Sequence, residues 1–385
     1  MSKRIIERRK ASANVPESNR ADIVYTEQKQ KRSVIKGILL AIVVLIAIVA
    51  LVFVVVNALI KNISESMSPK GSYKDTIPTI AESFKEGNGF YIDKVYNDAK
   101  FQKYAFLASN NHSSVVNSIK DEANVFNYAI YGIENSNPEK PSADMIIIAS
   151  FNKDTNKLTY VLVDDATLVY IPYADVIGQL KDAYNFGTAN LLSRTITQNF
   201  GIDIDGYVEM NMEAAAEMVD LVGGIEMTMT QEEVDNLNIA IELYNERFGA
   251  EVLKITKKGE KVTLNGVQTL AYLRGTTGSN TNAIFSILVE VTKLSIKDGV
   301  KGIKALTDKL AENATTSTEA DDFSSLLQIA VRTTGDALAD GIVTSNLSEN
   351  IKNIKILGEG QYEYFSAYED YNKVVTDLQV ALYGE

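Results

Sequence analysis

The longest uninterrupted apolar run in the chain extends from Gly37 to Ile60 and contains no charged residue. Asn57 is its one strongly polar side chain. At the helical rise of about 1.5 Å per residue the run reaches about 36 Å, which is enough to cross a bilayer. A cleaved signal peptide has a shorter apolar core and a small-residue cleavage site, and neither is found here. The pattern therefore predicts one transmembrane helix at residues 37–60.

The pattern is weaker between residues 61 and 125. Charged, weakly amphipathic stretches such as Tyr91–Ala108 alternate with turn signals at Pro69 and Pro78. Such stretches are typical of helices separated by turns. We interpret residues 61–125 as a spacer or small accessory region.

From residue 126 onward the pattern predicts a new domain built on buried strands. Apolar runs at Val125–Tyr131 and Met145–Ser150 have the length and composition of such strands. The polar segment Asn152–Lys157 then predicts a hairpin turn into a further strand, Leu158–Val163. Two helical patterns follow, at Tyr173–Tyr184 and Thr188–Phe200.

The segment Gly206–Met229 predicts a strand, a helix, a glycine pair and another strand. Met212, Ala215 and Val219 recur at helical spacing on one face, which indicates a helix packed over a sheet. Gly223 and Gly224 end that helix in the prediction, because glycine accepts the left-handed backbone of a helix C-terminus.

The rest of the chain alternates predicted helices with turns and one further strand. The mixture predicts an α/β fold, with a central mixed sheet covered by helices, in a domain at 126–305 continued by 306–385. The predicted elements are the helix Gln231–Phe248, a turn at 257–261, a short helix from Asn265-Gly266 to Arg274-Gly275, the apolar helix Ala283–Ile296, the strand Tyr362–Ala367 and the helix Asp370–Leu382.

Charge predicts how the chain is oriented in the membrane. Residues 1–36 hold ten Lys or Arg and four Asp or Glu, and basic flanks stay in the cytoplasm. The tail is thus expected inside the plasma membrane and the domain after residue 61 outside. The whole chain holds 38 Lys or Arg against 50 Asp or Glu, so the outer part is strongly acidic. Such a surface repels nucleic acid, which we exclude as a partner.

Residue usage excludes several chemistries. The chain has no cysteine, so disulfides, thiolate catalysis and cysteine-based zinc sites are ruled out. His112 is the one histidine, which argues against a Ser-His-Asp triad and against a histidine metal cluster. Its neighbours Asn110 to Ser114 predict a polar surface turn.

Five blocks together resemble a known family. Their order and spacing are similar to those of the extracytoplasmic domain of LytR-CpsA-Psr (LCP) proteins. The resemblance implies an LCP-type α/β/α domain. It also implies a membrane-anchored enzyme of Gram-positive-type bacteria, which moves a glycopolymer from polyprenyl pyrophosphate onto peptidoglycan. The blocks are Asn127–Glu134, Ser142–Ser150, Tyr170–Pro172, Gly206–Met227 and Leu264–Arg274.

The resemblance also implies a site in which carboxylates hold Mg²⁺ and arginines hold the pyrophosphate. Glu134 stands where the family usually has a metal-side Asp, and Asp144 matches the acid of the next motif. Both are the predicted metal ligands, since Mg²⁺ prefers oxygen ligands. Arg274 keeps the first arginine of a family pair and is the predicted catalytic and substrate-binding residue.

Other arginine positions of the family are changed. Asp165 stands where the family has a phosphate-binding arginine, and Ser142 and Thr276 replace two more. A carboxylate repels pyrophosphate, and the loss of each arginine contact to a phosphate slows phosphoryl transfer. We therefore keep Asp165 as a doubtful substrate-binding position.

Plainer interpretations of these residues stay open. Glu134 and Asp144 could hold water rather than metal, and Arg274 could close its helix. Asp164 and Asp165 are predicted to be solvated turn residues, since neighbours in a strand point to opposite faces and cannot form a glycosidase pair across a cleft.

Two functions therefore remain open. The first is a divergent Mg²⁺-dependent phosphotransferase in which lysines, or another arrangement of the metal, replace the lost arginines. The second is a non-catalytic homologue that binds polyprenyl-phosphate lipid or scaffolds envelope assembly.

Overall fold

The structure is a computed structural model, and it describes part of the chain after residue 72, with gaps. The predicted tail at 1–36, the predicted span at 37–60 and most of the predicted helix Ala283–Ile296 lie outside the described residues. Within the described ranges, no helix combines the length and the apolar character that a membrane crossing requires. The described residues are 73–81, 98–134, 141–155, 157–256, 259, 261–275, 289–290, 293, 314–317, 342–347, 351–357 and 362–384.

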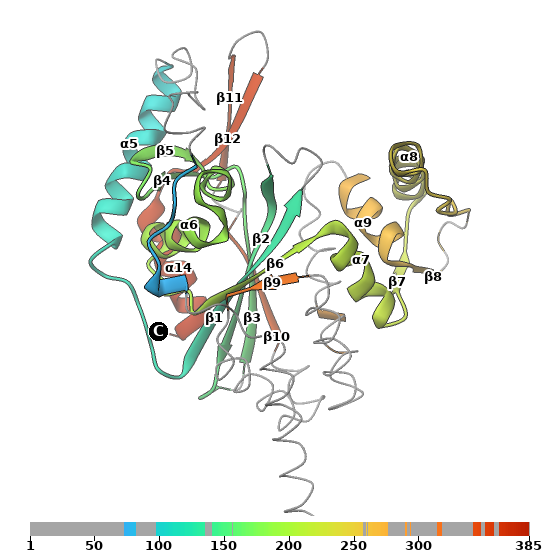
Figure 1. Cartoon of the computed structure of the whole chain (residues 1–385), viewed down its shortest axis with the longest axis horizontal. Coiled ribbons are helices and arrows are strands. Elements are labelled where there is room, and N and C mark those ends of the chain that lie inside the picture. Colours follow the sequence, from blue (N-terminus) through green and yellow to red (C-terminus); the bar gives the residue numbers. More distant parts are fainter. Residues whose placement is uncertain are drawn as a thin grey trace, which may run out of the picture. The chain divides into compact units, whose positions relative to one another are not determined.

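A six-stranded mixed sheet forms the centre of the fold (Figure 1). The strand order is β10-β3-β2-β1-β6-β9. Strands β1, β3, β6 and β10 run in one direction, and β2 and β9 run against them. The mixed sheet predicted from the sequence is confirmed. The strands are β1 (Val125–Glu134), β2 (Ser142–Asn152), β3 (Lys157–Val163), β6 (Gly206–Asn211), β9 (Ala314–Thr316) and β10 (Ile342–Asn346).

Three helices cover one face of this sheet: α5 (Ala99–Val115), α6 (Asp182–Phe200) and α14 (Tyr371–Tyr383). Their apolar side chains join those of the strands in the largest buried cluster of the described residues. Asp98 and Asp370 cap α5 and α14, because their carboxylates accept hydrogen bonds from backbone amides of the first turn.

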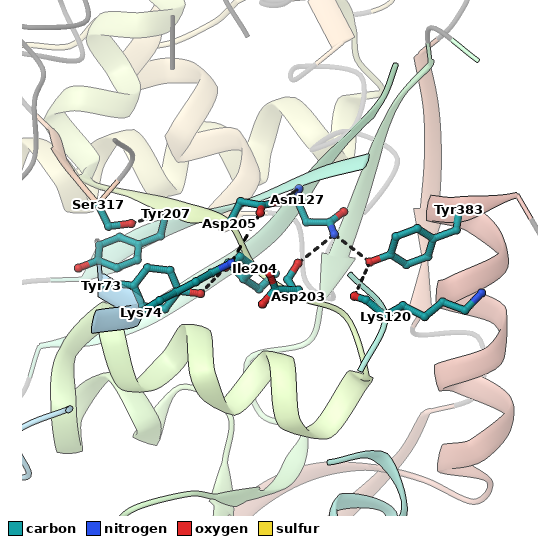
Figure 2. A network of polar contacts seen from close by, with 10 residues as sticks. All are labelled: Tyr73, Lys74, Lys120, Asn127, Asp203, Ile204, Asp205, Tyr207, Ser317 and Tyr383. Carbon is teal, nitrogen blue, oxygen red and sulfur yellow. Dashed lines mark hydrogen bonds and ion pairs between the residues drawn. The ribbon is translucent and has the colours of Figure 1, made fainter. Parts of the chain in front are cut away.

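Long-range polar contacts tie these helices to the sheet. The side-chain amide of Asn127 donates to Asp203 O at 2.9 Å and to the Tyr383 hydroxyl at 3.0 Å (Figure 2). Tyr383 in turn donates to Lys120 O at 3.0 Å. A strand near the start of the domain is thereby bonded to its last helix.

The helix predicted at Tyr173–Tyr184 is wrong. The chain instead forms a hairpin of β4 (Leu168–Ile171) and β5 (Val176–Gln179), and α6 begins only at Asp182. Pro172 ends β4, and the turn places Tyr173 at φ 66° and Asp175 at φ 55°, in the left-handed region. Non-glycine residues seldom adopt that region, so the residues at positive φ do not themselves mark the turn.

The polar turn predicted around His112 is also wrong. Residues 110–114 continue α5. The His112 ring lies 4.1 Å from the Tyr170 ring, and its Nε2 is 3.1 Å from Gln198 Oε1. His112 therefore helps to pack α5 against β4 and α6.

The strand-helix-strand prediction for Gly206–Met229 is confirmed by β6, α7 (Met212–Leu221) and β7 (Ile225–Thr228). Gly223 and Gly224 have φ near +89° and +88° and end α7 as expected. A Cβ on Gly224 would lie 2.6 Å from Leu264 O, so this position needs glycine for space as well as for conformation.

After β7 the chain builds a smaller unit with its own apolar core. Helices α8 (Gln231–Phe248) and α9 (Gly266–Gly275) pack together and against the hairpin of β7 with β8 (Lys261–Leu264). Both helices match their predicted ranges. Helix α9 also packs on α7, which follows directly from the central sheet.

The remaining described elements lie at either end of the domain. A short 3₁₀ turn, η1 (Tyr73–Asp75), precedes the first helix. Strands β11 (Ile351–Leu357) and β12 (Tyr362–Tyr368) form a hairpin before α14.

Candidate functional site

The candidate site is one edge of the central sheet, where the four parallel strands end. Glu134 closes β1, Asn211 closes β6 and Asn346 closes β10, while Asp164 follows the end of β3. In open α/β sheets this carboxyl edge is where ligands bind. The Glu134 side chain lies outside the described atoms, so its metal role stays a prediction.

Asp144 enters this edge from a β-bulge. In the pairing of β1 with β2, Gly132 faces Met145 but Ile133 faces Ala143, so Asp144 is the extra residue. A bulge frees one side chain from the strict alternation of the strand and re-aims it. The Asp144 side chain is exposed, and its Oδ1 accepts a hydrogen bond from Ser142 Oγ at 2.6 Å. The position predicted to carry a metal ligand thus presents an accessible carboxylate.

Asp165 faces a lysine that the sequence analysis did not single out. Lys181 Nζ lies 3.0 Å from Asp165 Oδ2, and the Lys181 amide donates to Asp165 O at 2.9 Å. The β4–β5 hairpin makes this contact, because its two strands return the chain to its starting point. The prediction that Asp165 is only a solvated turn residue is therefore wrong, although the turn itself is confirmed.

Asp164 stabilises that turn. Its Oδ1 accepts a hydrogen bond from the Ala166 amide at 2.9 Å, and its carbonyl accepts one from the Thr167 amide at 3.2 Å. A side chain that bonds the backbone two residues later is a common turn-forming device. Asp164 therefore sets the local geometry that aims Asp165.

Charges at this edge are coupled. Burial raises the pKa of Asp165, Lys181 offsets part of the rise, and the carboxylates of Asp164 and Asp144 add to it. Burial alone would lower the pKa of Lys181, but the carboxylate of Asp165 outweighs it and raises that pKa, helped by Asp144. Lys181 is therefore a stable cation, held by the carboxylate of Asp165.

Another carboxylate, that of Glu209, lies on β6 two residues before the end of the strand. Glu209 is the register partner of Tyr131 and is hydrogen-bonded by the Tyr184 side chain from the first turn of α6. Burial raises the pKa of Glu209, and the hydrogen bond with Tyr184 offsets part of that rise. Among the described residues its Oε2 is buried without a hydrogen-bond partner.

Arg274 belongs to a different element of the domain. It lies in the last turn of α9, which packs on α7 and α8, and its side chain is outside the described atoms. Its predicted catalytic and substrate-binding role therefore stays a prediction.

Arg194 is unavailable to a phosphate in this arrangement. Its Nη2 donates to three backbone carbonyls of the segment before α5, and its Nε donates to Asn190 Oδ1 at 3.0 Å. The role of this arginine is structural.

The described residues at this edge do not form a complete set of protein ligands for a magnesium ion. In the part of the chain that the structure describes, no three Asp, Glu or His residues converge on a common point. Mg²⁺ needs fewer protein ligands, since it is commonly held by one or two carboxylates together with substrate phosphates and water. Asp144 fits that requirement.

Sequence reasoning found the acids of the site but missed Lys181, because its segment was predicted as part of a helix. A hairpin predicted over Leu168–Gln179 would also have predicted that Lys181 lies beside Asp165, because the two residues flank its open end. The signal was Pro172 in the middle of an apolar run.

Comparison with known proteins supports the resemblance. The model of the LytR_cpsA_psr family matches residues 90–379. A polyisoprenyl-teichoic acid–peptidoglycan teichoic acid transferase, TagU of Bacillus subtilis, is 27% identical over 206 residues, or 52% of this chain and 60% of TagU. This chain thus spans less than two thirds of that relative.

Two solved structures share the fold. Protein gbs0355 from Streptococcus agalactiae has a TM-score of 0.54 and 19% identity, and the match covers 67% of this chain and 88% of that one. TagT bound to LIIa-WTA has a TM-score of 0.52 and 17% identity, with 70% and 96% covered. The family match spans most of the described domain and agrees with its mixed sheet, and the chain therefore belongs to the LytR-CpsA-Psr family.

Proposed function

We propose that this chain is a membrane-anchored extracytoplasmic transferase, which moves a glycopolymer from a polyprenyl-pyrophosphate carrier onto peptidoglycan. Family membership supports the proposal, as does the name of the relative TagU, a polyisoprenyl-teichoic acid–peptidoglycan teichoic acid transferase. The apolar run at 37–60 and the basic tail before it support a single plasma-membrane span with the domain outside.

One observation carries the catalytic part of the proposal. Lys181 is a partly exposed cation at the carboxyl edge of the sheet, and it feels the charge of the exposed Asp144 carboxylate. Breaking a phosphoanhydride develops negative charge on phosphate oxygens, and groups already aimed at that charge supply most of the catalysis. Lys181 would therefore take over part of the phosphate binding that arginines perform elsewhere in the family.

The remaining roles follow from position. Asp144, with Glu134 at the end of β1, would hold Mg²⁺ together with phosphate oxygens. Bound Mg²⁺ would neutralise charge on the phosphates. Arg274 would add a guanidinium from α9.

The second function, a non-catalytic homologue that binds polyprenyl-phosphate lipid, is favoured by a different observation. Asp165 is already paired with Lys181, so a phosphate must compete with a carboxylate for the same ammonium. A site that binds its anion weakly suits recognition of a lipid better than rapid turnover.

A turnover assay on the full-length protein in proteoliposomes tests the proposal. The assay supplies Mg²⁺, a polyprenyl-pyrophosphate saccharide and peptidoglycan, and it measures lipid binding and released polyprenyl phosphate together. Lys181→Ala is compared with Lys153→Ala, which removes an exposed lysine from the β2–β3 turn at the opposite end of these strands.

We expect turnover in the wild type, a loss of at least ten-fold in Lys181→Ala and little change in Lys153→Ala. Binding without turnover in all three proteins would replace the transferase with the lipid-binding homologue. Absence of both activities would overturn both functions.

A further inference from the structure

The segment Tyr73–Ala81 is fastened to the domain by one arginine. Arg194 Nη2 donates to the carbonyl oxygens of Tyr73 at 3.2 Å, Lys74 at 2.9 Å and Thr76 at 2.8 Å. At the far end of the segment, the Ala81 amide donates to Phe186 O at 2.8 Å. Since α6 supplies both Arg194 and Phe186, the segment follows that helix.

Contacts to β6 and the loop before it fix the start of the segment. The Tyr73 hydroxyl donates to Ile204 O, and Lys74 forms an ion pair with Asp203 (Figure 2). Lys74 Nζ also lies 3.6 Å from Asp205 Oδ1. The chain that enters the domain is therefore held on two elements at once.

Two large apolar side chains near these contacts are exposed to solvent, one in the segment and one in the β4–β5 turn. Ile77 is 79% exposed and Tyr173 is 49% exposed. Arg194 links the two segments that carry them, because its Nη2 donates to Thr76 O, next to Ile77, and its Nη1 donates to the Tyr173 hydroxyl at 3.4 Å. The Arg194 Cζ lies 5.7 Å from the centre of the Tyr173 ring.

Tyr173 is presented at a conformational cost. Its φ of 66° lies in the left-handed region, which glycine or asparagine would occupy more easily. Unfavourable backbone conformations persist where the surrounding structure holds them, and they concentrate at functional sites. An aromatic side chain held exposed in this way indicates a contact surface.

We propose that Ile77 and Tyr173 form a membrane-contact surface that seats the domain on the outer leaflet. This inference rests on the proposed anchor at 37–60. Thirteen residue steps separate Ile60 from Tyr73, so the chain allows at most about 45 Å between the end of that anchor and the fastened segment. Tyrosine is favoured at the membrane–water boundary, and isoleucine gains by leaving water.

The contact is apolar in character. Asp75 and Asp175 are exposed in the same two segments, and carboxylates do not attract anionic lipid headgroups. The surface therefore binds zwitterionic bilayers without a requirement for anionic lipid.

The surface also locates the candidate site. Tyr173 lies in the turn of the β4–β5 hairpin, and the opposite end of that hairpin carries the Asp165–Lys181 pair. Four strand residues extend about 13 Å. Contact of Tyr173 with the membrane would thus hold the Asp165–Lys181 pair about one hairpin length from the membrane surface. A phosphate carried by a membrane lipid could reach the pair there.

The test uses the full-length chain, which contains no tryptophan, so one introduced tryptophan is a unique fluorophore. Ile77→Trp and Tyr173→Trp are reconstituted in phosphatidylcholine vesicles with brominated acyl chains. Matched controls are Phe106→Trp on α5 and Leu243→Trp on α8, whose parent side chains are 66% and 61% exposed.

We expect bromine to reduce the fluorescence of Ile77→Trp and Tyr173→Trp at least two-fold and to leave both controls nearly unchanged. Adding Ile77→Ser to Tyr173→Trp should weaken the quenching. Chains that float with vesicles but show equal quenching, or none, at all four positions would overturn the contact surface alone. Failure to float would also overturn the anchored function.

Discussion

Lys181 and Asp165 are joined twice, through their backbones at 2.9 Å and through their side chains at 3.0 Å. The backbone bond lies just beyond the paired strands of the β4–β5 hairpin and does not depend on the side chains, so the lysine backbone stays in place even if the ion pair is broken. The charge of Asp165 can therefore be removed by mutation without displacing Lys181.

Asp165→Asn should raise the affinity of the protein for magnesium pyrophosphate. The change removes a negative charge near the expected phosphate position, which is worth about 1–2 kcal/mol at the effective dielectric of a partly buried site. The affinity should rise about ten-fold, as measured by titration calorimetry at pH 7.5. Asp164→Asn is the matched control, since an asparagine there can still accept the Ala166 amide. Equal effects of the two changes would contradict a specific role of Asp165.

Arg194→Lys should loosen the segment before α5 while it keeps the charge. A lysine cannot reach three carbonyls with one planar fork. We expect a loss of about 2 kcal/mol in the free energy of unfolding, because hydrogen bonds to charged groups are worth about 1.5–3 kcal/mol each. Hydrogen exchange at the Ala81 amide should accelerate at least ten-fold. Lys352→Ala, on β11, should leave both measurements unchanged.

Asp205 should make stability depend on pH. Burial raises its pKa to about 6, while the Asn127 amide and Lys74 hold the rise back. The pKa of an unfolded aspartate is about 3.9, so this group favours the folded state below that pH, and its contribution disappears as pH rises through 6.

The expected difference is about 2 kcal/mol between pH 4.5 and 7.5. Asp205→Asn should remove this difference from urea unfolding curves, because asparagine can still accept the Asn127 amide. Asp235→Asn, an exposed residue of α8, should retain it. A variant with unchanged pH dependence would show that Asp205 titrates as in the unfolded chain.

Gly266→Ala should displace α9 from α7. A Cβ at this position would lie 2.0 Å from Ala216 O. Overpacking of this kind typically costs about 1–3 kcal/mol. Gly223→Ala is a useful comparison, because its φ of +89° strains an alanine although no atom lies within 4 Å of the added Cβ. Only the first change should also lower α7–α9 protection in hydrogen exchange.

Long periodic segments were predictable from the sequence. Helices α7, α8 and α9 and strands β1, β2 and β12 follow their patterns, because each buries one face or is buried on both. The segment Tyr173–Tyr184 was not predictable, since its apolar spacing also fits a helix. Its turn depends on positive φ at residues that are not glycine.

The site was predictable only in part. Glu134 and Asp144 were placed by resemblance, but the bulge that re-aims Asp144 is a property of the register between two strands. Lys181 and Arg194 act through partners that lie far away in the chain or across a hairpin. No local pattern records such contacts. Strands β9 and β10 are short and pair with residues more than a hundred positions earlier, which hides them from periodicity as well.

The hydrogen bond between Asn127 and Tyr383 has a consequence for how the domain folds. The two residues are 256 positions apart, and the Asn127 side chain is buried. A chain that folds in sequence order can form the β1–β2–β3 meander early, but both edges of that meander stay open until β6 and β10 arrive. Contacts of such separation slow folding. The domain would therefore pass through a period with exposed strand edges, which would end only when its final helix packs on the sheet.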